Sequence, residues 1–418
     1  MELSEWDRTC LEGDEGPALA LATKILVRMG ELSGADRMID VISAHIDSCL
    51  YHGRAGLDFA ARLAGAGGQV RVPTTLNVSS LDLLHPELYR GDPETGRAAK
   101  QLMAHYVSMG CRQTWTCAPY QLPDRPGVGE HVAWAESNAI VFANSVLGAR
   151  TDRYGDFIDI CAALTARVPE AGFHLTERRA GRIVFDVTEV PDELRRSDVF
   201  FHVLGHLLGH ESGSEVPVVV GIDGASEDDL KAAGAAAASS GGVAMFHMVG
   251  VTPEAPTLEA ALQGREPART VRVGGDLIRK RYRELTTAEG DAFDAVSVGT
   301  PHMSAAEGRR LAQLFGGRAV HPGVAFYAST GRDVLRLLDS EGVVAQLEAS
   351  GVQLVTDTCT YVTPILQPGV RTVLTNAAKW AYYAPGNLGL DVMFDSLEAC
   401  VESAVAGRRV GGSDAWAG

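Results

Sequence analysis

The chain has 418 residues, of which 46% are apolar and 22% charged, the composition of an ordinary globular protein large enough for two or three lobes. Its 53 acidic and 37 basic side chains leave a net charge of −16, which argues against a nucleic-acid or anionic-membrane surface. No apolar run approaches the roughly 20 residues that a membrane helix needs. The acidic start, MELSEWDRTCLEGDEG, lacks an apolar signal region, so we expect a cytoplasmic protein.

The first half of the chain alternates helical patterns with short strand patterns. Apolar residues at helical spacing predict helices over 3–31, 56–66, 98–109, 134–147 and 158–167. The β-type runs Met38–Ala44 and Gln69–Val72 are each followed by a polar segment, 45–53 and 73–77. In open α/β sheets, ligands bind in such loops at the carboxyl ends of strands.

The stretch from Cys111 to Asp156 is unusually rich in polar side chains for a segment with an apolar run, 139–143. Each buried polar group needs a partner, so a site lined by carboxylate, amide, hydroxyl and guanidinium groups explains the pattern better than an ordinary core segment. The polar residues are Glu136, Ser137, Asn138, Asn144, Ser145, Arg150, Thr151 and Arg153.

Three histidines in FHVLGHLLGHESG, His202, His206 and His210, fall along one side of a helix and are a candidate zinc site. They lack the carboxylate that follows the first histidine of a HExxH protease. Gly205 and Gly209, also four residues apart, indicate close helix packing instead.

The second half continues the alternation. A buried strand at Glu215–Ile222 is typical of a parallel sheet, and an Ala-rich helix opening at Asp228 ends at Gly241. Further strands are predicted over 243–251, 270–274, 293–298 and 352–356, and a final helix over 396–404. The fold class is therefore α/β, with mostly parallel sheets flanked by helices in two or more lobes, divided here into 1–215 and 216–418.

The seven cysteines form no CxxC pair, and their odd number and wide spacing argue against a disulfide framework. They are Cys10, Cys49, Cys111, Cys117, Cys161, Cys359 and Cys400. Most are expected to be small buried side chains. A metal site would have to gather thiolates from distant parts of the chain.

Several phrases of this sequence, taken together, resemble the large subunit of aconitase X, a branch of the aconitase superfamily. They run in order from about residue 10 to 405 and include VPTTLN, TWTCAPYQLPDRPGVGEHVAWAESNAIVFANSVLGARTDR, DTCTYVTP, TNAAKWAYYAPG and LEACVESA. The resemblance implies an aconitase-like fold in which residues 1–418 form the catalytic region without the small swivel domain. A separate small subunit is then expected as a partner.

The resemblance also implies an activity, that of a hydro-lyase with an iron–sulfur cluster (2Fe-2S or 4Fe-4S) or iron. The usual bacterial reaction of the family converts cis-3-hydroxy-L-proline to 1-pyrroline-2-carboxylate, and the archaeal one dehydrates mevalonate 5-phosphate. The proton-abstracting serine of the superfamily would come from the small subunit, so this chain alone is expected to be inactive.

The candidate metal ligands are Cys117, Cys359 and Cys400, the three cysteines within the matched phrases TCAPY, DTC and LEACVE. An iron held by three thiolates, with one position open, can bind a hydroxyl group and carry it away. Cys49 and Cys111 are the next candidates.

The remaining candidates are assigned by chemistry. His45 and Asp47 are proposed to orient the hydroxyl or handle a proton, and Lys231 and Lys379 to stabilise an enolate-like charge. Arg150 and Arg153 are candidates for a carboxylate clamp. The predicted substrate-binding residues are Ser43, Thr74, Thr75, Asn77, Glu136, Ser137, Asn138, Asn144, Ser145, Arg150, Thr151 and Arg153.

One departure from the family pattern is Ala377-Ala378 before Lys379, where a small hydroxyl residue is usual. It leaves room for another substrate, such as mevalonate 5-phosphate. A further alternative is a non-catalytic binding protein that kept the fold and lost the cluster, although the chain retains every candidate ligand.

Overall fold

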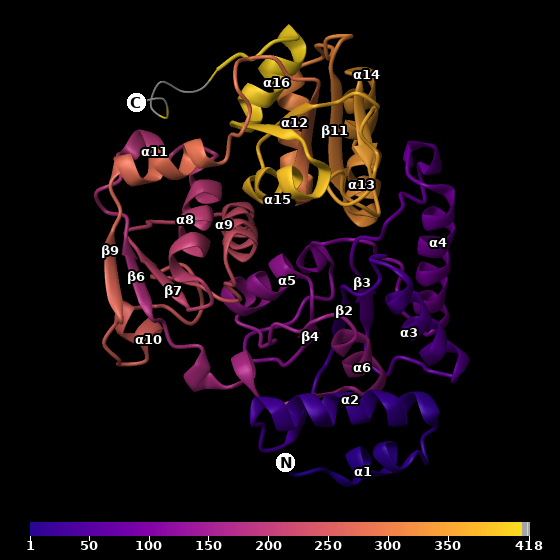
Figure 1. Ribbon diagram of the computed structural model, residues 1–418. Helices are drawn as coiled ribbons and strands as arrows, with labels where there is room; N and C mark the ends of the chain where they lie inside the picture. Colours follow the sequence, from indigo (N-terminus) through magenta and orange to yellow (C-terminus); the bar gives the residue numbers. More distant parts are fainter. Residues whose placement is uncertain (412–415, 417–418) are drawn as a thin grey trace.

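The computed structural model describes residues 1–411 and 416 (Figure 1). Its α-helices are α1 (Glu5–Glu12), α2 (Pro17–Ser33), α3 (Arg54–Gly65), α4 (Pro93–Ser108), α5 (Ser137–Phe142), α6 (Ile158–Thr165), α7 (Asp192–Arg195), α8 (Phe200–Ser212), α9 (Glu227–Ser240), α10 (Leu258–Leu262), α11 (Gly275–Glu284), α12 (Ala305–Phe315), α13 (Arg332–Ser340), α14 (Val343–Ala349), α15 (Ala378–Leu388) and α16 (Leu397–Ala406). Its strands are β1 (Met38–Asp40), β2 (Ala44–Ile46), β3 (Thr74–Leu76), β4 (Ala133–Trp134), β5 (Arg167–Pro169), β6 (Ile183–Asp186), β7 (Pro217–Val220), β8 (His247–Met248), β9 (Arg269–Arg272), β10 (Ala295–Met303), β11 (Ala325–Thr330), β12 (Val352–Val355), β13 (Thr372–Thr375) and β14 (Asp391–Phe394).

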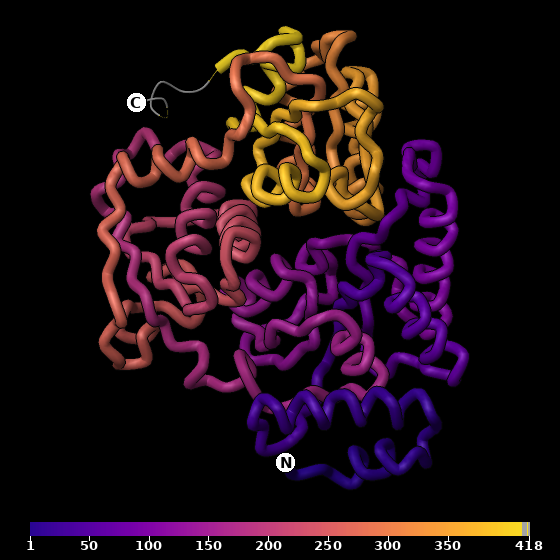
Figure 2. The backbone as a smooth tube through the Cα atoms, viewed as in Figure 1, coloured from indigo at the N-terminus to yellow at the C-terminus, as the bar shows by residue number. Residues whose placement is uncertain are grey.

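The chain forms three regions, which follow one another along the sequence (Figure 2). The first contains a parallel sheet in the order β3-β2-β4 and an antiparallel β1–β5 pair. Helices α2 and α6 pack against each other, and their apolar side chains share one core with strand β2. The strands of this region are short and buried, and they lie near the centre of the molecule (Figure 1).

The second region is a parallel sheet in the order β8-β7-β6-β9 with helices α8 and α9 packed together beside it. Gly205 of α8 allows this contact, because a β-carbon there would lie 2.2 Å from the carbonyl oxygen of Ala233 in α9. One turn later, a β-carbon on Gly209 would lie 2.1 Å from the hydroxyl of Ser240. The prediction that these two glycines mark close helix packing is confirmed.

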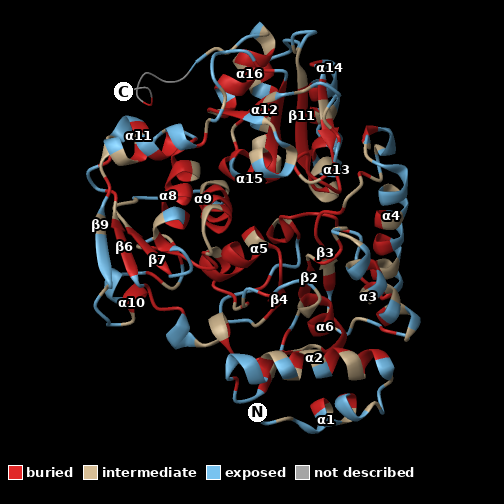
Figure 3. Ribbon diagram, viewed as in Figure 1, coloured by how far each residue is buried: buried red, intermediate tan, exposed pale blue. Residues whose placement is uncertain are grey.

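The third region is a parallel five-stranded sheet in the order β12-β11-β10-β13-β14. Its apolar strands are buried on both faces, as expected when helices cover both sides (Figure 3). The strand order reverses direction between β10 and β13, and such a switch point leaves a crevice at the carboxyl ends of the two strands.

The predicted α/β class with parallel sheets is confirmed, but several predicted boundaries shift. The strand expected over 69–72 lies instead at β3, so Thr74 and Thr75 belong to the strand, and His45 lies inside β2. The predicted helix over 134–147 begins only at α5, and its last turn, Ala143–Leu147, is a π-helix. A boundary at residue 215 would separate β6 from β7, which pair in one sheet, so the two predicted lobes do not match the sheets.

Within the described residues, no helix is both long and apolar enough to cross a membrane.

Candidate active site

The carboxyl ends of two parallel sheets meet between the first and third regions. In the first sheet, β2 leads to Asp47 and β3 leads to Asn77, and β4 leads to Glu136. The third sheet supplies His302 at the end of β10, Cys359 after β12 and Lys379 after β13. Contacts across the two sets place them in one site, because Lys379 binds Glu136 directly. The polar loops that the sequence placed after its strands therefore converge, as parallel sheets require.

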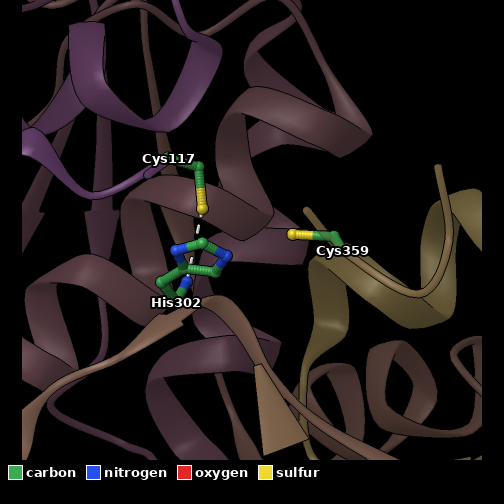
Figure 4. Close-up of side chains that lie close together, drawn as sticks. All are labelled: Cys117, His302 and Cys359. Carbon is green, nitrogen blue, oxygen red and sulfur yellow. Dashed lines mark hydrogen bonds between the residues drawn. The ribbon is translucent and has the colours of Figure 1, made fainter. Parts of the chain in front are cut away.

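Two cysteines form the centre of this site. Cys117, from the loop before β4, and Cys359 are both buried, and together with His302 their ligand atoms lie within 4.8 Å of one another (Figure 4). Burial, the largest single effect, opposes ionisation of Cys117, but the hydrogen bond from the thiol of Cys359 and the nearby His302 and Lys379 together lower the pKa of Cys117 to about 6. The same hydrogen bond, together with burial, raises the pKa of Cys359. The shared hydrogen bond therefore favours a single thiolate in the pair.

A buried ion pair borders the cysteines. The Nζ atom of Lys379 lies 2.6 Å from Oε1 of Glu136, and their side chains are 3% and 6% exposed. Burial alone would lower the pKa of Lys379, but the charge of Glu136 raises it, so the lysine is cationic. Glu136 also caps α5 through the amide of Ala139, 2.8 Å away. Asn138 donates to the carbonyl oxygen of Cys117, so α5 ties the ion pair to the cysteine loop.

A second carboxyl group faces Glu136 from the end of β2. Burial and the nearby charge of Glu136 raise the pKa of Asp47 to about 8, and the hydrogen bond from Asn77 only partly offsets this. Asp47 is thus protonated at neutral pH and suited to donating a proton. The carboxylate of Asp159 accepts the backbone amides of Asp47 and Ser48 at 2.8 and 3.0 Å, which fixes the loop.

His302 is a site residue that the sequence prediction missed. Its backbone amide donates to Sγ of Cys117 over 3.3 Å, and both of its ring nitrogens have partners in the cysteine-bearing loops. Its position at the end of a buried strand could have indicated a site residue. The sequence around it, VSVGTPHM, has few other polar groups, so the sequence pattern did not single it out.

Cys400 is the predicted ligand that the structure does not bring to the site. It lies on α16 and is buried among the apolar side chains that form the core of the third region. Burial and the charges of Asp395 and Asp198 raise the pKa of its thiol, which disfavours a thiolate there. Cys49 and Cys111, the next candidates, lie in the core of the first region.

The two arginines predicted to clamp a carboxylate also lie elsewhere. Arg150 donates to the carbonyl oxygen of His174 at 2.8 Å and to the hydroxyl of Thr176 at 3.0 Å, where the first region joins the second. Arg153 is exposed and lies beside Gly242. The structure does not bring the two arginines of the predicted clamp to the cysteines, because Arg150 binds the segment at His174 and Thr176 and Arg153 lies beside Gly242.

Three further predicted binding residues, Asn144, Ser145 and Thr151, form hydrogen bonds with the backbone and so have a structural role. Asn144 donates to the carbonyl oxygens of Thr151 and Ala244, and its own oxygen accepts the amide of Thr151. The hydroxyl of Ser145 accepts the amide of Phe246, and that of Thr151 bridges the backbone of Trp134. These buried side chains satisfy backbone groups at the π-helical turn, which explains their presence beside an apolar run.

Ser43, Thr74 and Thr75 lie before or within strands of the first sheet, not beyond the carboxyl ends that carry Asp47 and Asn77. Ser43 precedes β2 and Thr74 begins β3, so both sit near the amino ends of strands whose carboxyl ends carry Asp47 and Asn77. His45 is fully buried in mid-strand, where Nδ1 lies 2.8 Å from the hydroxyl of Thr75 and burial lowers its pKa to about 3. It is a neutral core histidine in this structure.

Lys231 pairs with carboxylates rather than with the cysteine group. Its Nζ atom lies 2.8 Å from Oδ1 of Asp228 and also contacts Glu307 of α12, so it joins the second and third regions.

The residues Ala377-Ala378, which depart from the family pattern, lie at the start of α15. Ala377 caps α15 without a side-chain hydrogen bond, and Nδ1 of His202 accepts the amide of Ala378 at 3.4 Å instead.

The histidines of α8 do not form a metal site. Among the described residues, the one group of three or more potential ligands within reach of a common ion is that of Cys117, His302 and Cys359. Nε2 of His206 lies 3.7 Å from Glu284, and His210 lies 3.7 Å from Glu211. The zinc hypothesis has no support in this geometry.

The donor atoms at the centre of the site fit an iron–sulfur cluster or iron. Two buried cysteines that share a hydrogen bond are the soft donors that iron in such clusters takes. They account for two of the three thiolates that the sequence predicted.

Models of three aconitase X domains match the chain: the first over residues 1–177, the second over 181–283 and the third over 293–406. These spans agree with the three regions of the fold, and the chain belongs to the aconitase X family.

Similar proteins include a cis-3-hydroxy-L-proline dehydratase from Pseudomonas aeruginosa, 46% identical over 99% of this chain and 72% of its own length. The enzyme of that name from Hypocrea jecorina is 43% identical over 97% of this chain and 69% of its own length. The phosphomevalonate dehydratase large subunit of Methanothermobacter thermautotrophicus is 36% identical over 94% of this chain and 96% of its own length. A crystal structure of Thermococcus kodakaraensis aconitase X in its holo-form superimposes with a TM-score of 0.87 at 30% identity, over 97% of this chain and all of that one.

Proposed function

We propose that this chain is the large part of an iron–sulfur-dependent dehydratase that converts cis-3-hydroxy-L-proline to 1-pyrroline-2-carboxylate. The observation that carries the proposal is the convergence of Cys117 and Cys359 on one buried point between two sheet edges, beside the Lys379–Glu136 pair. Similarity to two cis-3-hydroxy-L-proline dehydratases at 46% and 43% identity supports the substrate.

The reaction removes the α-proton and the 3-hydroxyl group of the substrate as water. A cluster held by Cys117 and Cys359 would supply the Lewis acid that hydroxide, a poor leaving group, needs. The ammonium group of Lys379 has three N–H donors, of which Glu136 and Ser137 accept two, at 2.6 and 3.4 Å. The third is available for the substrate carboxylate, whose negative charge grows as the α-proton leaves.

Asp47 is proposed to supply the proton that the leaving group needs. Because its pKa is raised to about 8, its carboxyl group is protonated at neutral pH and faces the negative Glu136. In this position it can protonate the departing hydroxyl group as water forms. The base that takes the α-proton is proposed to come from a small partner subunit, in line with relatives that are named large subunits.

The charges of the site favour an amino acid over a phosphate ester. Lys379 is the cation that borders the two cysteines in the described residues, and Glu136 already neutralises it. A phosphate dianion is normally bound by several arginine or lysine side chains. A zwitterionic hydroxyproline makes no such demand. Dehydration of mevalonate 5-phosphate, the reaction named for the archaeal relatives, is the alternative, in which the partner subunit would have to supply the phosphate site.

The test is to express the chain anaerobically with a small aconitase X subunit and to measure iron, sulfide, the visible spectrum and dehydration of each of the two substrates. We expect iron and sulfide together with formation of 1-pyrroline-2-carboxylate. Cys117→Ala and Cys359→Ala should lose the iron, whereas Cys161→Ala, a buried cysteine of the first core, should keep it. A colourless, iron-free wild-type protein would refute the proposal.

Cys400→Ala decides the third ligand. The present geometry predicts full iron content in this variant, because Cys400 lies in another core. Loss of iron would instead show that the third region rearranges when iron binds.

A cytoplasmic location remains a prediction, and the seven free, buried cysteines are in keeping with a reducing compartment.

A further inference from the structure

Both site cysteines are carried by turns of the same unusual form. Cys117 follows Trp115 by two residues, and Cys359 follows Asp357 by two residues. Trp115 and Asp357 have φ angles of 44° and 61°, in the left-handed region that side chains other than glycine rarely adopt. Such strained turns persist only where the surrounding structure holds them. The intervening residue is a threonine in both turns.

One residue holds both turns. The Nδ1 atom of His302 lies 3.1 Å from the hydroxyl of Thr116, and Nε2 lies 3.1 Å from the carbonyl oxygen of Thr358. The backbone of His302 takes part as well, because its amide donates to Sγ of Cys117 and its carbonyl accepts from Gln121 at 3.2 Å. His302 therefore bridges the first region, which supplies Cys117, and the third, which supplies Cys359.

The partners define the protons on the imidazole ring. The carbonyl oxygen of Thr358 is only an acceptor, so Nε2 carries the hydrogen and donates it. The hydroxyl of Thr116 accepts the amide of Ala118 at 3.1 Å and so turns its own hydrogen toward Nδ1. The lone pair of Nδ1 is occupied by this bond. His302 could bind a metal there only by breaking its contact with the Cys117 turn.

We infer that His302 is a positioning residue that holds the Cys117 and Cys359 turns at the spacing that iron requires, and that it is not itself a ligand. This inference rests on the proposed function, in that the two cysteines bind iron. Its physical basis is general, because hydrogen bonds to the segments that carry metal ligands fix their orientation. The packing leaves little freedom here. A β-carbon on Gly331 would lie 3.1 Å from the hydroxyl of Thr116 and 3.8 Å from Nδ1 of His302, so the loop before α13 packs closely against this contact.

Two substitutions separate positioning from ligation. His302→Leu removes both ring hydrogen bonds, and Thr116→Val removes the hydroxyl that Nδ1 accepts from while leaving the ring intact. If His302 positions the turns, both variants should weaken metal binding by about 10- to 100-fold, as loss of supporting hydrogen bonds does at other metal sites. If His302 is a ligand, Thr116→Val should bind metal as well as the wild type, because it frees the lone pair. His302→Gln has a side-chain N–H that can donate to Thr358 and an amide oxygen that can accept from Thr116, so it should bind within a few-fold of the wild type.

The first measurement uses Cd²⁺ and the cluster-free full-length chain, with binding followed by the sulfur-to-cadmium absorbance. It reports on the two thiolates whether or not the protein ever carries iron. Wild-type affinity in Thr116→Val would overturn the inference. Near-ultraviolet circular dichroism checks that each variant is folded, and Thr116→Val, which changes little volume, gives a decision even if His302→Leu does not fold.

The second measurement is pulsed electron paramagnetic resonance of the reduced iron–sulfur protein labelled with ¹⁵N-histidine. We expect no strong coupling from a histidine nitrogen, and such a coupling that is lost in His302→Gln would overturn the inference. A wild-type protein without iron and sulfide refutes the proposed function alone, since the Cd²⁺ result still tests whether His302 holds the two turns.

Discussion

Replacing Lys379 with methionine removes the ammonium group from an ion pair whose two side chains are almost entirely buried. At the observed 2.6 Å and an effective dielectric constant of about 20, the attraction between the two charges is about 6 kcal/mol, and the desolvation of both groups offsets much of it. Loss of one partner leaves Glu136 charged and buried, which typically costs about 3–5 kcal/mol. We expect about 3 kcal/mol for Lys379→Met, because Glu136 keeps its hydrogen bond from the amide of Ala139.

The free energy of unfolding is measured by urea titration of the cluster-free chain, for Lys379→Met, Glu136→Gln and the double variant. The double variant should be more stable than the sum of the single effects predicts, by about 2 kcal/mol, because it leaves no unpaired charge. Arg309 and Glu341 form the matched control, an ion pair at the same 2.6 Å but with side chains 42% and 32% exposed. Removing that pair should have no measurable effect. Additive single effects at Lys379 and Glu136 would refute the reasoning.

Three further predictions concern packing and pH. Gly205→Ala should destabilise the chain by about 3 kcal/mol or more, because its β-carbon would lie 2.2 Å from the carbonyl oxygen of Ala233. Gly56→Ala in α3, where a β-carbon meets no atom within 4 Å, is the control and should stabilise the chain by about 0.5–1 kcal/mol. Equal melting temperatures in the two variants would contradict this prediction. Because the pKa of Asp47 is raised to about 8 in the folded chain, stability is lost as pH rises from about 4 toward 8, so Asp47→Asn should melt above the wild type at pH 8 and together with it near pH 4. The pKa of His45 is lowered to about 3 by burial, so acid destabilises the fold by about 1.4 kcal/mol per pH unit below pH 6.5 through this group, and His45→Gln should show a correspondingly flatter dependence of unfolding free energy on pH.

The site residues found from the sequence share one property: they follow directly on strands or lie within a matched phrase. Asp47 comes immediately after β2, Asn77 comes immediately after β3, and Glu136 lies two residues beyond β4. The order of strands and loops can be read along the chain. Cys117 and Cys359 lie in phrases of the aconitase X resemblance, and the structure brings them together. Local pattern was sufficient for Asp47, Asn77 and Glu136 because the carboxyl ends of parallel strands in one sheet share one edge.

The errors concern side chains whose partners come from distant segments. Arg150 lies three residues from Arg153 in a polar stretch that suits a substrate clamp, yet it turns to the backbone of His174 at the junction of two regions. Cys400 is in a matched phrase, but the packing of α16 directs it into the core of the third region. Neither direction is encoded in the residues next to the side chain.

The sequence by itself determined the class of fold, the close packing of the helix that carries Gly205, and two of the thiols at the site, because periodicity, glycine spacing and family phrases are local properties of the chain. Only the tertiary structure decided which groups meet across the two sheet edges. The Lys379–Glu136 pair spans 243 positions, and the contact between Thr116 and His302 spans 186. Such pairs form when whole regions dock, and the docking depends on the sum of many packing contacts rather than on any short pattern.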